Sequence, residues 1–134
     1  MAVESNSKHT ILIGRILLSL IFLISAAGKL FNFTGTAGMM SAKGFPVASL
    51  FLIGALAFEL LGGLSVLTGY KARLGAAALI VFLIPVTLIF HNFWAYQGME
   101  QQMQAAMFLK NLAIAGGLAL VIAFGSGPLS VDKN

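Results

Sequence analysis

Runs of apolar residues alternate with short polar stretches along the whole chain. A membrane-spanning helix needs about 20 predominantly apolar residues, and four runs reach that length. They predict transmembrane helices over residues 11–33, 47–69, 74–94 and 105–124. The pattern therefore predicts an all-α fold, an integral membrane four-helix bundle that forms one domain over residues 1–134.

Composition and charge agree with a protein that resides in a lipid bilayer. Of the 134 residues, 59% are hydrophobic and 9% are charged, whereas soluble domains carry about 25% charged residues. The apolar runs recur up to residue 124, which argues against a lone cleavable signal peptide. The formal net charge is +4, but the basic residues stand singly at the ends of the apolar runs. Nucleic-acid binding is therefore not expected, and the lipid bilayer is the expected partner.

The distribution of basic residues predicts the orientation of the helices. Lys71 and Arg73 lie in the turn between the second and third runs, and Lys8 and Lys133 lie in the two tails. Basic residues in short loops favour the cytoplasmic side of a membrane. Both termini are therefore predicted to be cytoplasmic, and residues 129–134 are expected to form a short tail.

The chain lacks the residues of the commonest metal and redox sites. It has no cysteine, which removes disulfides, thiol chemistry and thiolate ligands. Its two histidines, His9 and His91, lie far apart in the sequence and show no metal-ligand spacing. No metal site is predicted.

A carboxylate interrupts the second apolar run. Glu59 lies near the middle of the predicted span, where a charged group costs roughly 2.5–3.5 kcal/mol on insertion scales. Helical spacing places it on one face with Ala55, Gly62 and Val66. Small residues let membrane helices approach closely, so Glu59 is expected to face another helix.

A stripe of residues on the first span also carries charge. Arg15, Ser19, Phe22, Ala26 and Lys29 follow one another at helical spacing and share one face. Two interpretations are open. Either the two cations extend to the headgroups on opposite sides of the membrane, or the stripe faces the interior of the bundle.

Two interpretations of Glu59 follow from these positions. In the first, Glu59 is an interhelical clamp that forms an ion pair with Arg15 or Lys110. In the second, it forms the floor of a pocket that opens outward. The candidate ligand-binding residues of that pocket are Glu59, His91, Asn92, Trp94, Lys110 and Asn111. A quinone or another small amphipathic ligand would suit the pocket, with His91 and Glu59 exchanging protons.

The connections carry their own signals. Residues 36–43 are expected to form one or two amphipathic turns at the interface, and residues 95–104 are expected to form a polar loop. Pro85 is expected to kink the third span. Phe93, Trp94 and Tyr96 are typical of an aromatic belt at the membrane surface.

A weak internal repeat links the two halves of the chain. Residues 22–39 match residues 82–99 at seven of eighteen positions. This alignment predicts a parallel repeat of two helices plus two helices. Glu59 has no acidic counterpart in the fourth span, and His91 aligns with Phe31, so the polar residues break the symmetry.

Several short motifs occur in an order that resembles the DoxX family. They are GRILLSLIFLISAAGKLFNF in the first span, ELLGG beginning at Glu59, FHNFW beginning at Phe90, FLKNLA beginning at Phe108, and GPLSVD beginning at Gly127. The resemblance covers nearly the whole chain. It implies four helices in a bacterial inner membrane, with recurrent polar positions at Arg15, Lys29, Glu59, His91, Lys110 and Asn111.

The resemblance also frames the functional hypotheses. The family takes its name from a subunit associated with thiosulfate:quinone oxidoreductase, which implies a redox-associated membrane subunit that binds a quinone-like ligand beside a protein partner. One alternative is a non-enzymatic scaffold or assembly factor that packs against membrane proteins, or against a second copy, through its glycine faces. Another is a small-solute transporter. No reaction is predicted for the chain.

Overall fold

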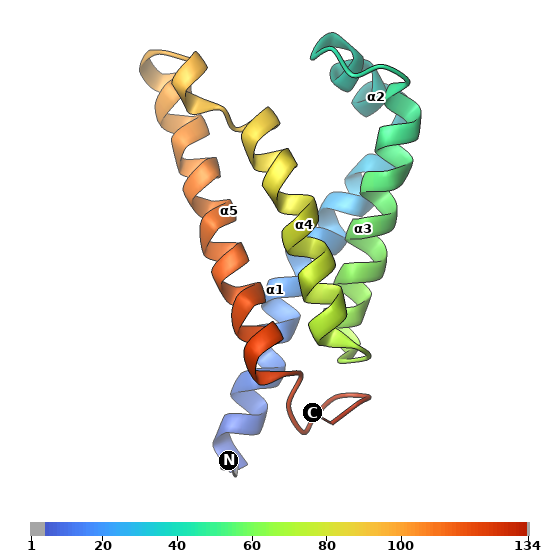
Figure 1. Cartoon of the computed structure of the whole chain (residues 1–134), viewed down its shortest axis with the longest axis vertical. Helices are drawn as coiled ribbons and strands as arrows, with labels where there is room; N and C mark the ends of the chain where they lie inside the picture. The colour runs from blue at the N-terminus through green and yellow to red at the C-terminus, as the bar shows by residue number, and fades with distance from the viewer. Residues whose placement is uncertain (1–4, 134) are drawn as a thin grey trace.

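Helices account for nearly all of the chain. The computed structural model describes residues 5–133. Four long helices are α1 (Ser5–Phe31), α3 (Ala48–Thr68), α4 (Ala72–Phe90) and α5 (Gly98–Phe124), and two short ones are α2 (Phe33–Ala42) and the 3₁₀ helix η1 (Phe93–Ala95) (Figure 1). The described part contains no strand. Each long helix, with η1 extending α4, is long and apolar enough to cross a membrane, which confirms an all-α protein with four candidate spans.

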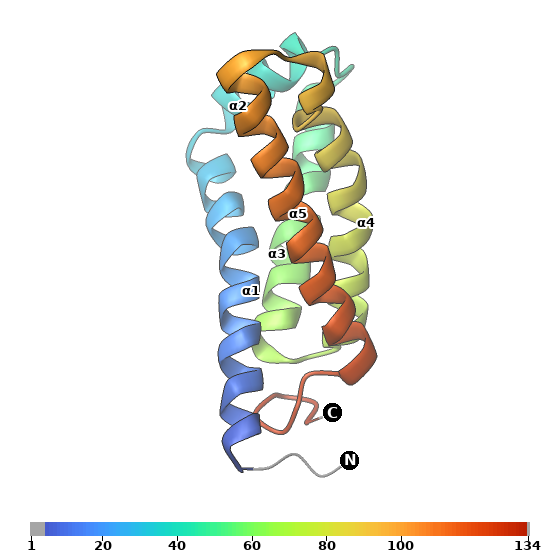
Figure 2. The ribbon, with the colours of Figure 1, turned by 90° about the vertical axis from the view of Figure 1, so that its left-hand side faces the viewer.

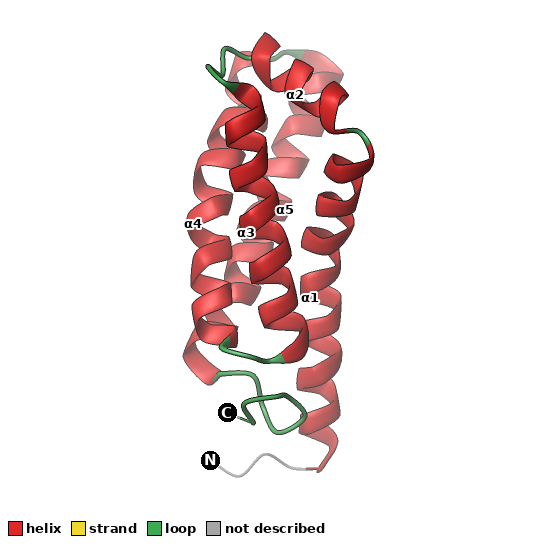
Figure 3. Cartoon of the chain, turned by 90° about the vertical axis from the view of Figure 1, so that its right-hand side faces the viewer, coloured by secondary structure: helices red, strands yellow, loops and turns green. Residues whose placement is uncertain are grey.

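The long helices form a row that is open on one side. Neighbouring pairs pack along their length in the order α1, α3, α4, α5, whereas α1 and α5 scarcely touch. Figure 2 shows α1 and α5 on the same side of the molecule, with α3 and α4 behind them. Figure 3 shows α2 across one end of the row. We call this the α2 end, and the opposite end, where α1 begins and α5 finishes, the terminal end.

The charged stripe of α1 faces the interior of the bundle. Arg15, Ser19, Phe22 and Ala26 are all buried, and the side chain of Lys29 is only 24% exposed. Other faces of α1 present large apolar side chains such as Leu17 outward. The interpretation that the stripe faces the interior is confirmed, and the expectation that Arg15 extends to the headgroups is wrong.

Glycines bring α3 and α4 together in the terminal half of the molecule. A Cβ atom added to Gly75 would lie 2.2 Å from Ser65 Oγ, and one added to Gly62 would lie 2.6 Å from Leu79 Cγ. A side chain at either position would force its neighbour to move. Close backbone approach of this kind is how helices gain packing energy inside lipid.

The connecting segments differ from the predicted loops. The turn expected within residues 36–43 belongs to the ten-residue helix α2. The polar loop expected over residues 95–104 is wrong for its greater part, because α5 already begins at Gly98. Glutamate, glutamine and methionine favour helices, so the helix continues beyond its apolar part. Pro85 lies inside α4 without ending it.

The segment expected to be a short tail is held against the terminal end. The amide of Val131 donates to the carbonyl oxygen of Thr68 at 2.9 Å, and the amide of Lys71 donates to Asp132 Oδ2 at 2.6 Å. Ser126 is buried. Residues 125–133 therefore cover the turn between α3 and α4. The 2+2 internal repeat and the cytoplasmic placement of both termini stay predictions.

Candidate functional site: a buried ion pair beside a cavity

Glu59 forms an ion pair with Lys29. Glu59 is 1% exposed, and its Oε1 atom accepts a hydrogen bond from Lys29 Nζ at 2.6 Å. The same ammonium group donates to Ser25 Oγ at 2.6 Å. The expected partners were Arg15 and Lys110, and this expectation is wrong. The pair joins α1 to α3 near the middle of α3.

The relative height of the helices explains why Lys29 is the partner. Depth counted along each span separately would place Lys29 near the outer ends of the helices and Glu59 close to mid-membrane. In the structure α1 ends below the beginning of α3, and α2 fills the remaining height (Figure 3). Lys29 and Glu59 consequently lie close enough for the flexible lysine to reach the carboxylate.

Arg15 has a different environment at the terminal end. Its Nη1 atom donates to the carbonyl oxygens of Val66 and Leu67, each at 3.4 Å, and its Nη2 atom donates to the carbonyl oxygen of Leu129. The last carbonyls of a helix lack partners within the helix, and a cation there also meets the negative end of the helix dipole. Arg15 therefore caps α3 and ties residues 125–133 to it.

The ion pair leaves hydrogen-bonding capacity unused. Glu59 Oε2 is buried and has no hydrogen-bond partner within the described part of the chain. Lys29 Nζ carries three hydrogens, of which two are directed to Glu59 and Ser25. Buried polar groups are rarely left without a partner, so a free acceptor beside a spare donor is characteristic of a binding site.

Both residues of the pair line a cavity of about 680 Å³. Binding cavities for small molecules typically measure about 300–1,000 Å³. The polar residues of its wall are Ser25, Lys29, Thr36, Glu59, His91, Lys110 and Asn111, supplied by α1, α2, α3 and α5 and by the end of α4. The remaining wall is apolar and includes Phe51, Phe58 and Phe82.

Aromatic pairs bridge the two sides of the cavity. The rings of Phe58 on α3 and Phe82 on α4 stack at 6.0 Å between centroids. Nearer the α2 end, Phe45 stacks on Phe90 at 5.8 Å. Met40, which is buried, and Phe45 also line the cavity.

Four of the six candidate ligand-binding residues meet at this cavity: Glu59, His91, Lys110 and Asn111. Trp94 and Asn92 do not line it. Trp94 is 57% exposed and packs against Phe93 and Phe108. Lys29 was missing from the predicted set, although its place on the charged stripe of α1 was the signal that pointed to it.

Two of the cavity residues are held in place by neighbouring side chains. His91 Nδ1 lies 2.8 Å from Gln104 Oε1. An amide oxygen only accepts hydrogen bonds, so Nδ1 donates in this pairing when it carries the proton. Asn111 Nδ2 donates to Thr87 Oγ1 at 3.0 Å. The first contact links α5 with the residue that follows α4, and the second links α5 with α4 itself.

The arrangement suits the binding of a ligand better than the binding of a metal. No group of three histidine, cysteine or carboxylate side chains gathers anywhere in residues 5–133. What the site offers instead is one ion pair with a free acceptor, two further basic side chains and aromatic walls.

Comparison with known proteins finds relatives among bacterial inner membrane proteins. It is 33% identical over 123 residues to the inner membrane protein YqjF of Escherichia coli, an alignment that covers 92% of this chain and 89% of the relative. The inner membrane protein YphA of the same organism is 31% identical over 124 residues, which cover 92% and 89% of the two chains.

A eukaryotic relative is also similar over part of its length. The ER-derived vesicles protein ERV29 of Saccharomyces cerevisiae is 30% identical over 140 residues, which span all of this chain and 38% of that protein. No solved structure matches. The DoxX family model matches residues 10–92, which include most of α1 and all of α2, α3 and α4. This multi-pass membrane protein belongs to the DoxX family.

Proposed function

We propose that the chain binds a quinone-like or other small amphipathic ligand in the cavity beside Glu59, and that it acts as a redox-associated subunit of the inner membrane. The observation that carries the proposal is Glu59 Oε2, a buried acceptor without a partner among residues 5–133, in the wall of a cavity of about 680 Å³. Inner-membrane relatives support the proposed location.

The distribution of polar groups sets the chemistry of the ligand. The spare hydrogen of Lys29 suits a carbonyl oxygen of the ligand, and Glu59 Oε2 suits a hydroxyl or another donor. The aromatic side chains of the wall suit a flat ring. A ring with oxygen substituents meets all three requirements, which is the chemistry of a quinone and its reduced form.

His91 gives the site a group that can accept and donate a proton. It lines the same cavity, and Gln104 holds its ring. Under the proposal, His91 and Glu59 accept or supply the protons that accompany a change in the ligand's oxidation state. The electrons would pass to or from a partner protein, which the family resemblance leads us to expect.

The scaffold alternative relied on exposed glycine faces, and two of its glycines are used inside the chain. Gly62 lies against Leu79, and a Cβ atom on Gly63 would lie 2.9 Å from Leu23 Cδ2. These glycines therefore serve the packing of α3 against α4 and α1. They are not free to receive another membrane protein.

A tryptophan placed in the cavity wall tests ligand binding. Trp94, the only tryptophan of the chain, lies outside the cavity, so the variant Trp94→Phe with Phe51→Trp moves the fluorophore into the wall. In lipid nanodiscs a tail-less benzoquinone is expected to quench this variant saturably. In the unmodified chain, quenching of Trp94 should rise only linearly with quinone concentration.

Glu59→Gln in the same background gives the matching control. It keeps the shape of the side chain but weakens the pairing with Lys29, and the saturable phase should shift to at least about tenfold higher quinone concentration. Linear quenching in all variants, with unchanged thermal stability on adding quinone, would contradict the proposal.

A further inference from the structure

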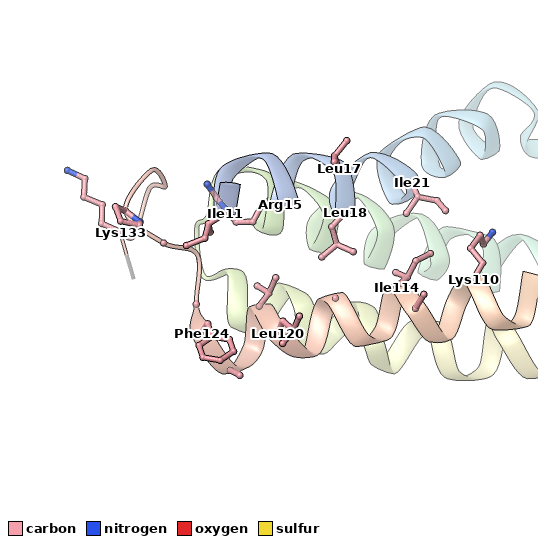
Figure 4. Close-up of a pocket in the computed structure, with 18 residues that line it drawn as sticks. Ile11, Arg15, Leu17, Leu18, Ile21, Lys110, Ile114, Leu120, Phe124 and Lys133 are labelled. Carbon is pink, nitrogen blue, oxygen red and sulfur yellow. The ribbon is translucent and has the colours of Figure 1, made fainter. Parts of the chain in front are cut away.

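A second concavity lies between the two helices that scarcely touch. Its volume is about 1160 Å³, and it runs along α1 and α5 toward the terminal end. In Figure 4, Leu18 and Ile21 of α1 point toward α5, and Ile114 of α5 points back toward α1. We call this concavity the α1–α5 groove.

The α1–α5 groove and the cavity beside Glu59 share part of their walls. Ile21, Lys110 and Ile114 line both. The polar site and the groove are therefore adjacent, and they meet where these three side chains stand between α1 and α5. From this continuity we propose that the α1–α5 groove holds the long apolar tail of a ligand whose polar head binds beside Glu59.

The lining of the groove fits a hydrocarbon chain. Between Lys110 at one end and Arg15 and Lys133 at the other, the side chains are apolar or absent, as at Leu18 and Gly117. From Ala113 to Phe124 the α5 wall of the groove extends about 16 Å at the helical rise of 1.5 Å per residue. This is about half of the 30 Å hydrocarbon thickness of a bilayer, as expected for a tail that runs from mid-membrane to one face.

On the opposite side of the cavity, α3 and α4 pack closely against each other. Below the cavity, α3 and α4 are closed by the stack of Phe58 on Phe82 and by the contacts of Gly62 and Gly75. The α1–α5 side is more open, because these two helices scarcely touch. The inference rests on the proposed function, because it assigns a substrate class, a long-tailed amphiphile, to the same site.

Adjacent glycines on α5 supply a matched pair of variants. Gly117 lines the groove, and a Cβ atom there would lie 3.3 Å from Leu18 Cδ1. Gly116 points elsewhere, and a Cβ atom added to it would have nothing within 4 Å. Gly117→Leu therefore fills the groove, and Gly116→Leu adds the same side chain outside it.

Two probes separate the tail from the head. One is a tail-less benzoquinone and the other is the same quinone with a long isoprenoid tail, both measured in nanodiscs with the tryptophan introduced by Phe51→Trp. In Gly117→Leu the tailed quinone should bind about tenfold more weakly, and the tail-less quinone should bind as before. Gly116→Leu should change neither affinity.

The outcomes distinguish the two proposals. If both quinones bind and Gly117→Leu alters neither affinity, or alters both equally, the tail site is overturned and the proposed function stands. If neither quinone binds the unmodified protein, the proposed function falls and the tail site falls with it.

Photolabelling of the unmodified chain covers the case in which Gly117→Leu does not fold. A quinone with a diazirine at the end of its tail should label residues 11–21 and 113–124. Labelling of the outer surfaces of α3 and α4 would overturn the inference. Loss of the label on adding anionic, but not zwitterionic, phospholipid would also overturn it, because the groove would then be a phospholipid site.

Discussion

The two halves of the molecule treat buried charge in opposite ways. At the terminal end, the Arg15 guanidinium directs its donors to three backbone carbonyls, and glycines bring α3 and α4 into close contact nearby. Toward the α2 end, the charge of Lys29 meets the carboxylate of Glu59, one oxygen stays without a partner among the described residues, and a cavity lies alongside.

Both cations lie on the same face of the same helix, so position on α1 does not explain the difference. The difference lies in what each cation meets. Arg15 is held by backbone carbonyls, although its Nε atom is buried without a partner among the described residues and its side chain lines the end of the α1–α5 groove. The ion pair instead presents a carboxylate oxygen at the edge of a cavity. We infer that the terminal half contributes most to stability and that the α2 half binds the polar head of the ligand, and four substitutions test that division.

The largest effect is expected from Arg15→Met. The variant leaves the carbonyls of Val66 and Leu67 without their charged donor. Hydrogen bonds to charged groups contribute about 1.5–3 kcal/mol each. The free energy of unfolding in mixed micelles should therefore fall by about 3–5 kcal/mol. Leu17→Met, on the exposed face of α1, is the control and should change it by less than about 0.5 kcal/mol. Equal stabilities would show that Arg15 does not secure the terminal end.

Glu59→Leu should lower the free energy of unfolding by a smaller amount, about 2–3 kcal/mol, because it leaves Lys29 without its anionic partner. The loss is limited because Lys29 is partly exposed and can turn away from the site. Adding Lys29→Met should restore most of the lost stability, because a hydrophobic pair can replace an ion pair. A double variant that is no more stable than Glu59→Leu would mean that the two side chains do not form a pair.

Gly75→Ala tests the close packing of the terminal half. Its Cβ atom would overlap Ser65, and overpacking costs about 1–3 kcal/mol, so thermal stability should fall accordingly. Gly54→Ala, in the wall of the cavity with open space around it, should leave stability unchanged or slightly raised. The division into halves fails if the two alanines destabilise equally.

The smallest effect is expected from Asn111→Ala. It removes the hydrogen bond to Thr87, which contributes about 1 kcal/mol, and it should also weaken the binding of the tail-less quinone. Replacing both residues, with Asn111→Leu and Thr87→Val, should restore stability without restoring quinone binding. Recovery of both would show that Asn111 serves packing alone.

Features that depend on helical periodicity and on the length of an apolar run could be predicted from the sequence. The four spans and the helical turns within residues 36–43 follow from helical spacing and run length, and the structure confirms them. Spacing also placed the α1 stripe on one face, but it left open whether that face lies inside the bundle, which the structure shows. The gathering of Glu59, His91, Lys110 and Asn111 near one cavity followed from the cost of burying polar groups in lipid.

Features that depend on the relative height of helices were beyond such reasoning. Lys29 reaches Glu59 because α1 ends lower than α3 begins, which no single span encodes. The docking of residues 125–133 rests partly on backbone hydrogen bonds, such as that from Val131 to Thr68, which leave no side-chain signature. Trp94 was placed in the site because a continuous helix would put it on one face with His91, but α4 ends at Phe90 and the ring of Trp94 packs against Phe93 and Phe108.

The open row of helices has a consequence for the order in which the molecule loosens. Helix α3 is flanked by α1 and α4, and Arg15 secures α1 to it, whereas α5 packs along its length only on α4 and η1. Elements with fewer contacts open at lower free energy than the rest of a protein. Among the long helices, amide exchange should therefore be slowest in α3 and faster in α1 and α5, which stand at the two edges of the row, and excursions of either edge helix would widen the α1–α5 groove.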